Sequence, residues 1–265
     1  MHAVFRSVSI FGFALAIGAL SGCATPPPAS DAAAAAEFRE TNDPLEPTNR
    51  VFYEINDGID TVLMRPLAQG YRAVVPPPVR TGVHNLLTNM GAPVVLANDM
   101  LQGKPTRAGD TFMRFIINTT VGVAGIFDVA KEWGYPHHDN GFGTTLALWG
   151  VDEGPFLFLP ILGPSNPRDL TGFGVDLVTD PWMWVGAGTG KTIFNWSRFA
   201  LGAVDERERV LDAVDGIKKT ALDPYATFRS LYRQSRNAAV RAVREDNRMT
   251  QPNWFPQAPA TRPAQ

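Results

Sequence analysis

The 265-residue sequence predicts a mostly α-helical protein. Apolar side chains recur with the 3.6-residue period of a helix along most of residues 42–248. Prolines and glycines stand at the borders of these periodic segments, where helices begin and end. No run of residues keeps the apolar–polar alternation of a half-buried strand, so we expect no sheet.

Residues 1–22 have the composition of an export signal, with His2 and Arg6 ahead of an apolar run over residues 8–19. That run is too short to cross a bilayer comfortably. The residues LSGC that follow match the lipobox of bacterial lipoproteins and end in Cys23, the only cysteine of the sequence. We therefore expect residues 1–22 to be a lipoprotein signal peptide and Cys23 to carry the lipid anchor. A plain signal peptide with an incidental cysteine is the alternative.

Composition divides the remaining chain into three regions. Residues 23–41 are rich in proline and alanine and predict a tether whose proline part is extended, with a short helix as the alternative for the alanine run. Residues 42–248 carry the helical periodicity and predict one helical domain. Residues 249–265 are again rich in proline and predict a disordered tail.

The first predicted helix has Thr48 as its N-cap and ends at Pro66. Two further helices are predicted, one closed by Gly91 and the next stopped by Gly103. The apolar stripe of the first helix consists of Val51, Phe52, Ile55, Ile59, Val62 and Leu63.

The next predicted helix begins at Thr106 or Asp110 and is apolar on nearly every side from Phe112 to Val129. A helix of this kind either forms the centre of a core or faces lipid. Its Asn118 and neighbouring threonines make it too polar for a confident membrane span.

Residues 134–190 are broken by glycines and prolines. They contain FLFLPIL, residues 156–162, an apolar run too short to cross a membrane. Trp182 and Trp184 follow, and tryptophan favours the membrane–water interface. This region is either a buried connection or a membrane contact.

The last third predicts three helices, Lys191–Ala203, Glu206–Thr220 and Asp223 to Asp246. The buried stripe of the last one is expected at Tyr225, Phe228, Leu231, Tyr232, Ser235, Ala239 and Ala242. Its arginines are expected on a solvated face, with an acidic partner or phosphate head groups as the alternative: Arg229, Arg233, Arg236 and Arg244.

The charge balance excludes one class of partner and indicates another. With 24 Lys and Arg against 26 Asp and Glu, the net charge of −2 leaves no basic face for nucleic acid. Residues 141–197 carry few charges, whereas residues 206–248 carry them closely spaced. This contrast indicates that part of the fold meets something less polar than water.

Three stretches could carry chemistry, and each has a simpler explanation. GAGTGKT at residues 186–192 has Val185 where a phosphate-binding loop needs glycine, so its glycines are expected to open a helix. His137 and His138 are adjacent and tend to diverge, which favours a polar turn over a metal site. The sequence has no GxSxG elbow, and acylation would consume Cys23. We expect no enzyme activity, no cofactor and no metal.

Longer stretches resemble the MlaA (VacJ) family of outer-membrane lipoproteins. They are NDPLEPTNRVFYEIND, VRTGVHNLLTNMGAPVVLANDMLQG, AGDTFMRFIINTTVGVAGIFDVAKEWG and FGTTLALWGVDEGPFLFLPILGPSNPRDLTG, followed by DPY at residues 223–225. The resemblance covers residues 42–235 in order. The sequence departs from the family pattern in the tether and in the tail.

The resemblance implies a compact, ring-shaped helical domain with a Gly/Pro-rich central loop region, seated in the inner leaflet of the outer membrane. It implies a lipid anchor on the periplasmic side, and Ala24 after the cysteine resembles the outer-membrane sorting pattern. The family removes phospholipids that have strayed into the outer leaflet. It is associated with trimeric porins and passes lipid to a soluble periplasmic carrier, which maintains lipid asymmetry.

A lipid path of this kind needs apolar walls for the acyl chains. The candidates are apolar residues in the membrane-facing half: Phe52, Ile55, Phe112, Phe115, Ile116, Phe156, Phe158, Leu159, Trp182 and Trp184. The alternative is a scaffold lipoprotein that binds porin or cell wall and keeps these residues in its core. A hydrolase would need a clustered nucleophile or metal set, which the sequence does not show.

Overall fold

Helices make up most of the chain, as the sequence predicts. The computed structural model describes residues 24–246 except 26 and 29. The predicted signal peptide, Cys23 and the predicted tail 249–265 lie outside the described residues.

The described elements follow in this order. They are α2 (Ala32–Thr41), α3 (Glu46–Ile59), the π-helix η2 (Asp60–Met64), α4 (Arg65–Val74), α5 (Pro77–Leu101), α6 (Pro105–Thr120), α7 (Val129–Glu132), α8 (Phe142–Leu148), β1 (Leu157–Leu159), β2 (Gly163–Ser165), α9 (Pro167–Thr179), the 3₁₀ turn η3 (Pro181–Met183), α10 (Gly188–Arg209), α11 (Leu211–Thr220) and α12 (Pro224–Arg244).

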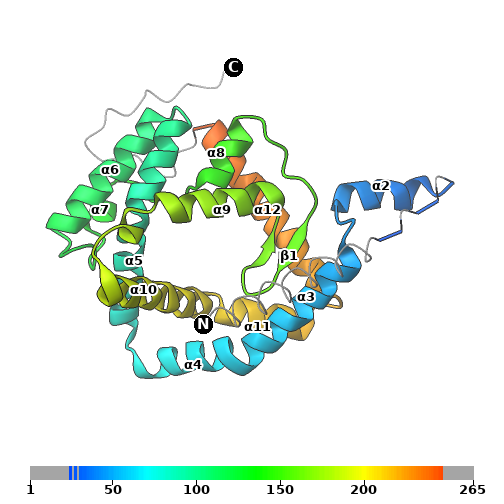
Figure 1. Ribbon diagram of the computed structural model, residues 1–265, viewed down its shortest axis with the longest axis horizontal. Coiled ribbons are helices and arrows are strands. Elements are labelled where there is room, and N and C mark those ends of the chain that lie inside the picture. The colour runs from blue at the N-terminus through cyan, green and yellow to red at the C-terminus, as the bar shows by residue number, and fades with distance from the viewer. Residues whose placement is uncertain (1–23, 26, 29, 247–265) are drawn as a thin grey trace, which may run out of the picture.

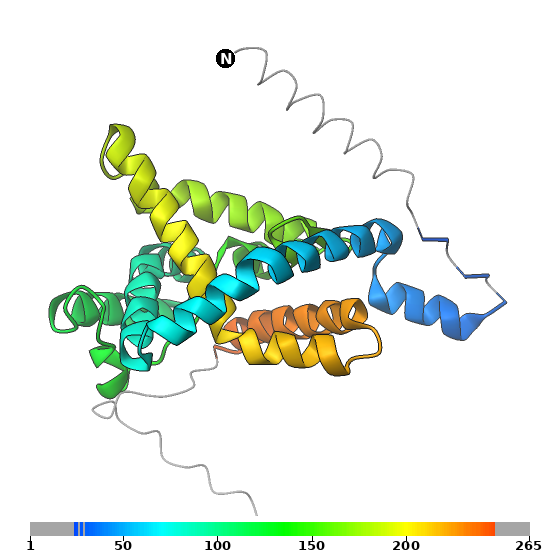
Figure 2. The ribbon, with the colours of Figure 1, turned by 90° about the horizontal axis from the view of Figure 1, so that it is seen from below.

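The ribbons are arranged in a ring, and α2 projects from it to one side (Figure 1). The helix α4 packs against α10, α5 packs against α6 and α10, and α8 packs against α9 and α12. Figure 2 shows α11 and α12 on one side of the α3–α4 arm, with α9 and the first turns of α10 on the other.

The helical arm continues past Pro66, where the sequence predicted an end. The backbone N–H of Arg65 donates to the carbonyl of Asp60, five residues back, in the wider π-helical turn η2. Proline has no N–H to donate, and π-turns inside helices accommodate such an interruption. The N-cap prediction is also wrong, because α3 begins at Glu46, before Thr48.

The two helices that the sequence predicts before Gly91 and before Gly103 form one continuous helix, because α5 runs through Gly91 and Pro93. The predicted stop near Gly103 is confirmed, since its φ of +66° is in the left-handed region that favours glycine. The predicted apolar helix that follows is interrupted after α6, where Val123 and Gly125 also have positive φ. A Cβ at Gly125 would lie 2.5 Å from the Cβ of Asn89, so this turn packs closely on α5.

Residues 134–190 hold more regular structure than the sequence predicts. They contain α8 and α9, and Asn166 caps α9 by accepting a 2.8 Å hydrogen bond from the N–H of Asp169. They also contain a two-stranded antiparallel hairpin in which Leu157 pairs with Ser165. The expectation of no sheet is therefore wrong, because left-handed Ile161 and Gly163 turn this short run back on itself.

The last three helices lie close to their predicted positions, although α10 continues to Arg209. The expected solvated arginine face of α12 is wrong for three of its members. Arg229 pairs with Asp43 at 2.8 Å, Arg233 with Glu153 at 3.1 Å and Arg236 with Asp169 at 2.8 Å. These pairs join α12 to distant parts of the chain. Within the predicted buried stripe, Tyr225 is buried but Leu231 is 47% exposed.

The largest apolar cluster lies between α3, the hairpin and α12. Phe156, Phe158 and Tyr225 are buried there, and Phe52, Tyr53 and Tyr232 pack around them. Edge-to-face contacts connect the rings, such as Tyr53 with Phe158 at 5.5 Å between centroids. A smaller cluster consists of Ile117, Ala130 and Tyr135.

Candidate functional site

The buried side chains of the described residues are more often polar than apolar. Asp99 is fully buried and accepts hydrogen bonds from Thr111 at 2.7 Å and Asn140 at 2.7 Å. The ring of His138 lies 2.9 Å from the same carboxylate. Burying a carboxylate is costly unless hydrogen bonds satisfy it, so this network holds α5, α6 and the segment before α8 together.

Many large apolar side chains are exposed, and within α6 the polar side chains are buried while apolar ones face outward. Asp110, Arg114 and Asn118 are buried, whereas Phe112 and Ile116 are 48% and 41% exposed. A helix of a water-soluble domain normally has the opposite arrangement. The outer face of α6 therefore suits an apolar surrounding.

A second apolar surface, which we call the α10 tip, lies at the beginning of α10. Figure 2 shows these first turns projecting beyond the rest of the ring. The exposed residues of the α10 tip are Trp184, Val185, Ile193, Phe194, Trp196 and Phe199. The ammonium group of Lys191 lies 5.4 Å from the ring centre of Trp184. Aromatic side chains beside a cation are typical of the boundary between lipid and water.

Among the described residues, no helix combines the length and apolar character needed to cross a bilayer. Exposed apolar patches of this extent mark surfaces that bind a membrane or another protein.

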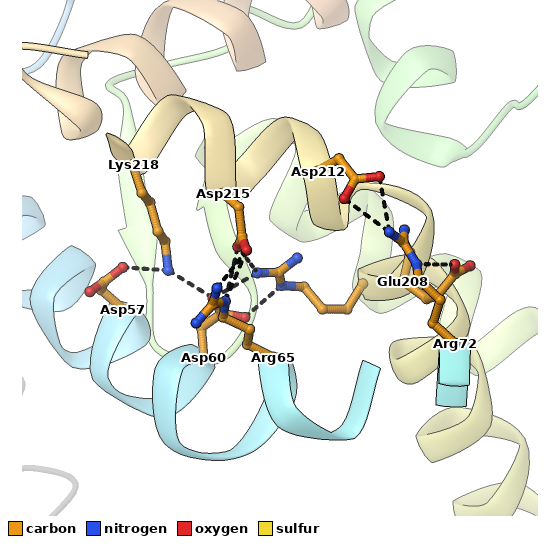
Figure 3. Close-up of polar contacts among 9 residues, drawn as sticks. Asp57, Asp60, Arg65, Arg72, Glu208, Asp212, Asp215 and Lys218 are labelled. Atoms are coloured by element: carbon orange, nitrogen blue, oxygen red, sulfur yellow. Dashed lines mark hydrogen bonds and ion pairs between the residues drawn. The ribbon is translucent and has the colours of Figure 1, made fainter. Parts of the chain in front are cut away.

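Ion pairs connect the α3–α4 arm to α10 and α11, and we call this set the seam (Figure 3). Arg65 pairs with Asp215 at 2.8 Å, and Arg72 pairs with Glu208 at 2.7 Å. Lys218 bridges Asp57 at 2.5 Å and Asp60 at 2.7 Å. The full set of residues in the seam is Asp57, Asp60, Arg65, Arg72, Arg207, Glu208, Asp212, Asp215 and Lys218.

Two carboxylates of the seam, Asp60 and Asp215, are held in the charged form. Burial by itself raises the pKa of Asp60, but hydrogen bonds from Arg207 and Lys218 outweigh it and place the pKa below its usual value. The hydrogen bond from Arg65 lowers the pKa of Asp215 in the same way. Ion pairs therefore attach the arm to α10 and α11, while its apolar Val62 and Leu67 stay exposed.

The predicted lipid-path residues lie in several different surroundings. Phe52, Phe156, Phe158 and Leu159 lie in or beside the aromatic cluster and the hairpin, where Phe156 and Phe158 are buried. Trp182 is partly buried and donates from Nε1 to the carbonyl of Met90 at 2.8 Å. The exposed members are Ile55, Phe112, Ile116 and Trp184. Their role in a lipid path stays a prediction.

Phe115, the remaining candidate, lines a cavity of about 370 Å³ between α5, α6 and the segment 128–139. Ala92 and Val95 line it with Phe115, and Arg114 and Lys131 contribute charges. The sequence did not predict this cavity as a site. The adjacent His137 and His138, which also line it, were its only visible signal.

The histidines are used in hydrogen bonds. His138 faces Asp99, and His137 Nε2 lies 3.2 Å from Asp139. In the part of the chain that the structure describes, no group of three metal-ligating side chains could hold an ion. The GAGTGKT stretch begins α10, with Gly188 at its first position, as the sequence predicts.

Comparison with known proteins gives one consistent result. The sequence model of the family described as MlaA lipoprotein matches residues 41–239. An uncharacterized protein of Rickettsia bellii is 38% identical over 203 residues, which is 76% of this chain and 78% of the relative. The intermembrane phospholipid transport system lipoprotein MlaA of Haemophilus influenzae is 36% identical over 204 residues, 75% of this chain and 79% of the relative. The protein of the same name from Escherichia coli (strain K12) is 34% identical over 230 residues, 83% and 85% of the two chains.

The fold agrees with this assignment. A solved structure described as "Structural basis for maintenance of bacterial outer membrane lipid asymmetry" matches with a TM-score of 0.64 at 30% identity. The match covers 75% of this chain and 98% of that one. The chain belongs to the MlaA lipoprotein family.

Proposed function

We propose that this chain is an outer-membrane lipoprotein that removes mislocalised phospholipids from the outer leaflet and passes them toward a periplasmic carrier. Two relatives are named as lipoproteins of an intermembrane phospholipid transport system, and the matched structure concerns outer-membrane lipid asymmetry. Cys23 would carry the acyl anchor that holds the domain at the membrane from the periplasmic side. Anchoring by more than one chain is the condition for stable attachment.

The observation that carries the proposal is the apolar exterior over a polar interior. The outer face of α6 and the α10 tip suit acyl chains, while the buried Asp99 and Arg114 networks suit hydrated groups. A body embedded in one leaflet needs an arrangement of this kind, whereas a freely soluble domain does not.

Lipid transport needs a protected route more than it needs bond chemistry. Drawing a two-chain phospholipid into water exposes about 28 methylenes at about 0.8 kcal/mol each, or about 20 kcal/mol. A path with apolar walls lowers this barrier without any covalent step. Phe115 of α6 lines the cavity and is a candidate wall, while Phe112 and Ile116 lie on the exposed face of the same helix. Selectivity would come from the leaflet to which the path opens.

The alternative is a scaffold lipoprotein that binds a trimeric porin or the cell wall and carries no lipid. The exposed α10 tip suits a protein partner as well as lipid, so the distinction needs bound lipid. Detergent-free purified protein is expected to hold phospholipid stoichiometrically, measured by organic extraction and mass spectrometry. A protein that folds but holds no phospholipid would favour the scaffold.

Leaflet selectivity is tested in asymmetric vesicles that carry the anchored protein on one face and a labelled phospholipid in a single leaflet. The proposal expects extraction to depend on which leaflet holds the label. Equal extraction from both leaflets would contradict it.

A further inference from the structure

The cavity beside α6 has a composition that indicates which part of a lipid it would take. Its inner part is formed by Arg114, which bonds both oxygens of Asp128 at 2.8 Å and the carbonyl of Tyr135 at 2.7 Å. Arg114 is buried and paired with Asp128, so it shapes the cavity while Asp128 balances its charge. Val95 and Phe115 supply an apolar wall.

Two charged groups of opposite sign remain available where the cavity opens. Lys131 is exposed, and its ammonium group makes no hydrogen bond or ion pair with another described residue. Asp139 is exposed, and His137 Nε2 lies 3.2 Å from its carboxylate. The hydrogen bond from His137 lowers the pKa of Asp139, which keeps the carboxylate ionised at neutral pH.

The volume matches a head group rather than a whole lipid. Ligand pockets in proteins start at about 300 Å³, and a cavity of about 370 Å³ is at the small end of that range. Among its Arg, Lys and Asp side chains, the cavity balances Arg114 and Lys131 against Asp128 and Asp139. It therefore has no net attraction for a purely anionic group.

We propose that this cavity holds the head group of a zwitterionic phospholipid, with the phosphate on Lys131 and the ammonium group on Asp139. The apolar wall at Val95 and Phe115 then receives the first methylenes of the acyl chains. This inference rests on the proposed function and adds the head-group class to it.

The test uses the full lipidated chain in polymer nanodiscs with two photoactivatable phospholipids. One has a phosphoethanolamine head group and the other a phosphoglycerol head group, and both carry the same diazirine near the glycerol end of one acyl chain. Mass spectrometry locates the crosslinks. We expect them in α5, α6 and residues 128–139, with the phosphoethanolamine lipid favoured about 1.5- to fivefold, the ratio that corresponds to one exposed ion pair.

The variants separate the two contacts. Lys131→Ala is expected to lower crosslinking of both lipids at this cavity, and Lys131→Arg to restore it. Asp139→Asn is expected to remove the preference, because only the ammonium group contacts that carboxylate. Lys219→Ala, an exposed lysine at the end of α11, is the matched control and is expected to behave as wild type.

Two outcomes overturn the inference in different ways. If lipids crosslink elsewhere in the protein but not here, or Asp139→Asn keeps the wild-type preference, the head-group site is wrong and lipid transport stands. If the wild-type chain crosslinks no phospholipid at all, the proposed function fails and the head-group site fails with it. Circular dichroism of each variant confirms that it is folded.

Discussion

Arg207 on α10 bonds both carboxylate oxygens of Asp60 in the π-helical turn, at 2.6 and 3.0 Å. The two residues are 147 positions apart in sequence, and both side chains are largely buried. Arg207 also lies 3.5 Å from Asp215. This pair is the centre of the seam that closes the α3–α4 arm on α10 and α11.

Arg207→Ala is expected to lower the free energy of unfolding by about 2–3 kcal/mol, because it leaves the Asp60 carboxylate without its main partner. Tryptophan fluorescence during urea unfolding measures the change. Arg241→Ala, at an exposed position of α12, is the control, and its free energy of unfolding is expected to change by less than about 0.5 kcal/mol. Equal stability of the two variants would show that the seam does not hold the arm.

Stability is expected to fall as the solution becomes acidic. Burial raises the pKa of Asp60, Asp128 and Asp169, but hydrogen bonds from Arg207, Arg114 and Arg236 outweigh it and lower each pKa. A carboxyl with a lowered folded-state pKa stabilises the fold above its unfolded pKa of about 3.9, and this contribution is lost as pH falls through the folded value.

Thermal midpoints measured from pH 7 to pH 2 test this expectation. We predict little change down to about pH 5 and a progressive loss below about pH 4. A midpoint that rises on acidification would contradict the sign of these pKa shifts.

Phe158→Ala is expected to lower the free energy of unfolding by about 3–4 kcal/mol, because the ring is buried against Tyr53 and Tyr225. Chemical unfolding of the purified protein measures it. The sequence placed Phe158 on a lipid path, and a variant that loses lipid binding at unchanged stability would favour that role over packing.

Phe199→Asp is expected to weaken membrane binding with little effect on folding, since Phe199 is 52% exposed at the α10 tip. A charge on a lipid-facing position costs between about 1 and 4 kcal/mol, depending on depth. Vesicle flotation of the domain without its acyl anchor measures the loss, and Lys219→Asp is the control. Unchanged flotation would show that the α10 tip faces something other than lipid.

Helices were predictable from the sequence because their signals are local. The periodic stripe of α3 and the glycine stop after α5 depend on residues within one or two turns. Pro66 and Gly91 misled the prediction, since a wider π-turn accommodates the first and α5 runs uninterrupted through the second. The hairpin was missed because its strands are three residues each.

The candidate site was less predictable, because its partners are distant in sequence. Arg229 pairs with Asp43 across 186 positions and Arg236 with Asp169 across 67, so a solvated arginine face and a paired one look alike in sequence. Phe156 and Trp184 also look alike as apolar residues of one charge-poor region, yet the first is buried and the second is 67% exposed. Only tertiary packing determines whether such an apolar residue lines a path, lies in the core or is exposed on the surface.

The amount of phospholipid in the outer leaflet of the source bacterium tests the central claim most directly. A membrane-impermeant amine reagent on intact cells labels phosphatidylethanolamine at the surface, and extracted lipids are then quantified. We predict that cells without this protein accumulate surface phospholipid, that the wild-type chain removes it, and that Cys23→Ala, although folded, does not. Surface phospholipid that is the same with and without the protein would contradict the account.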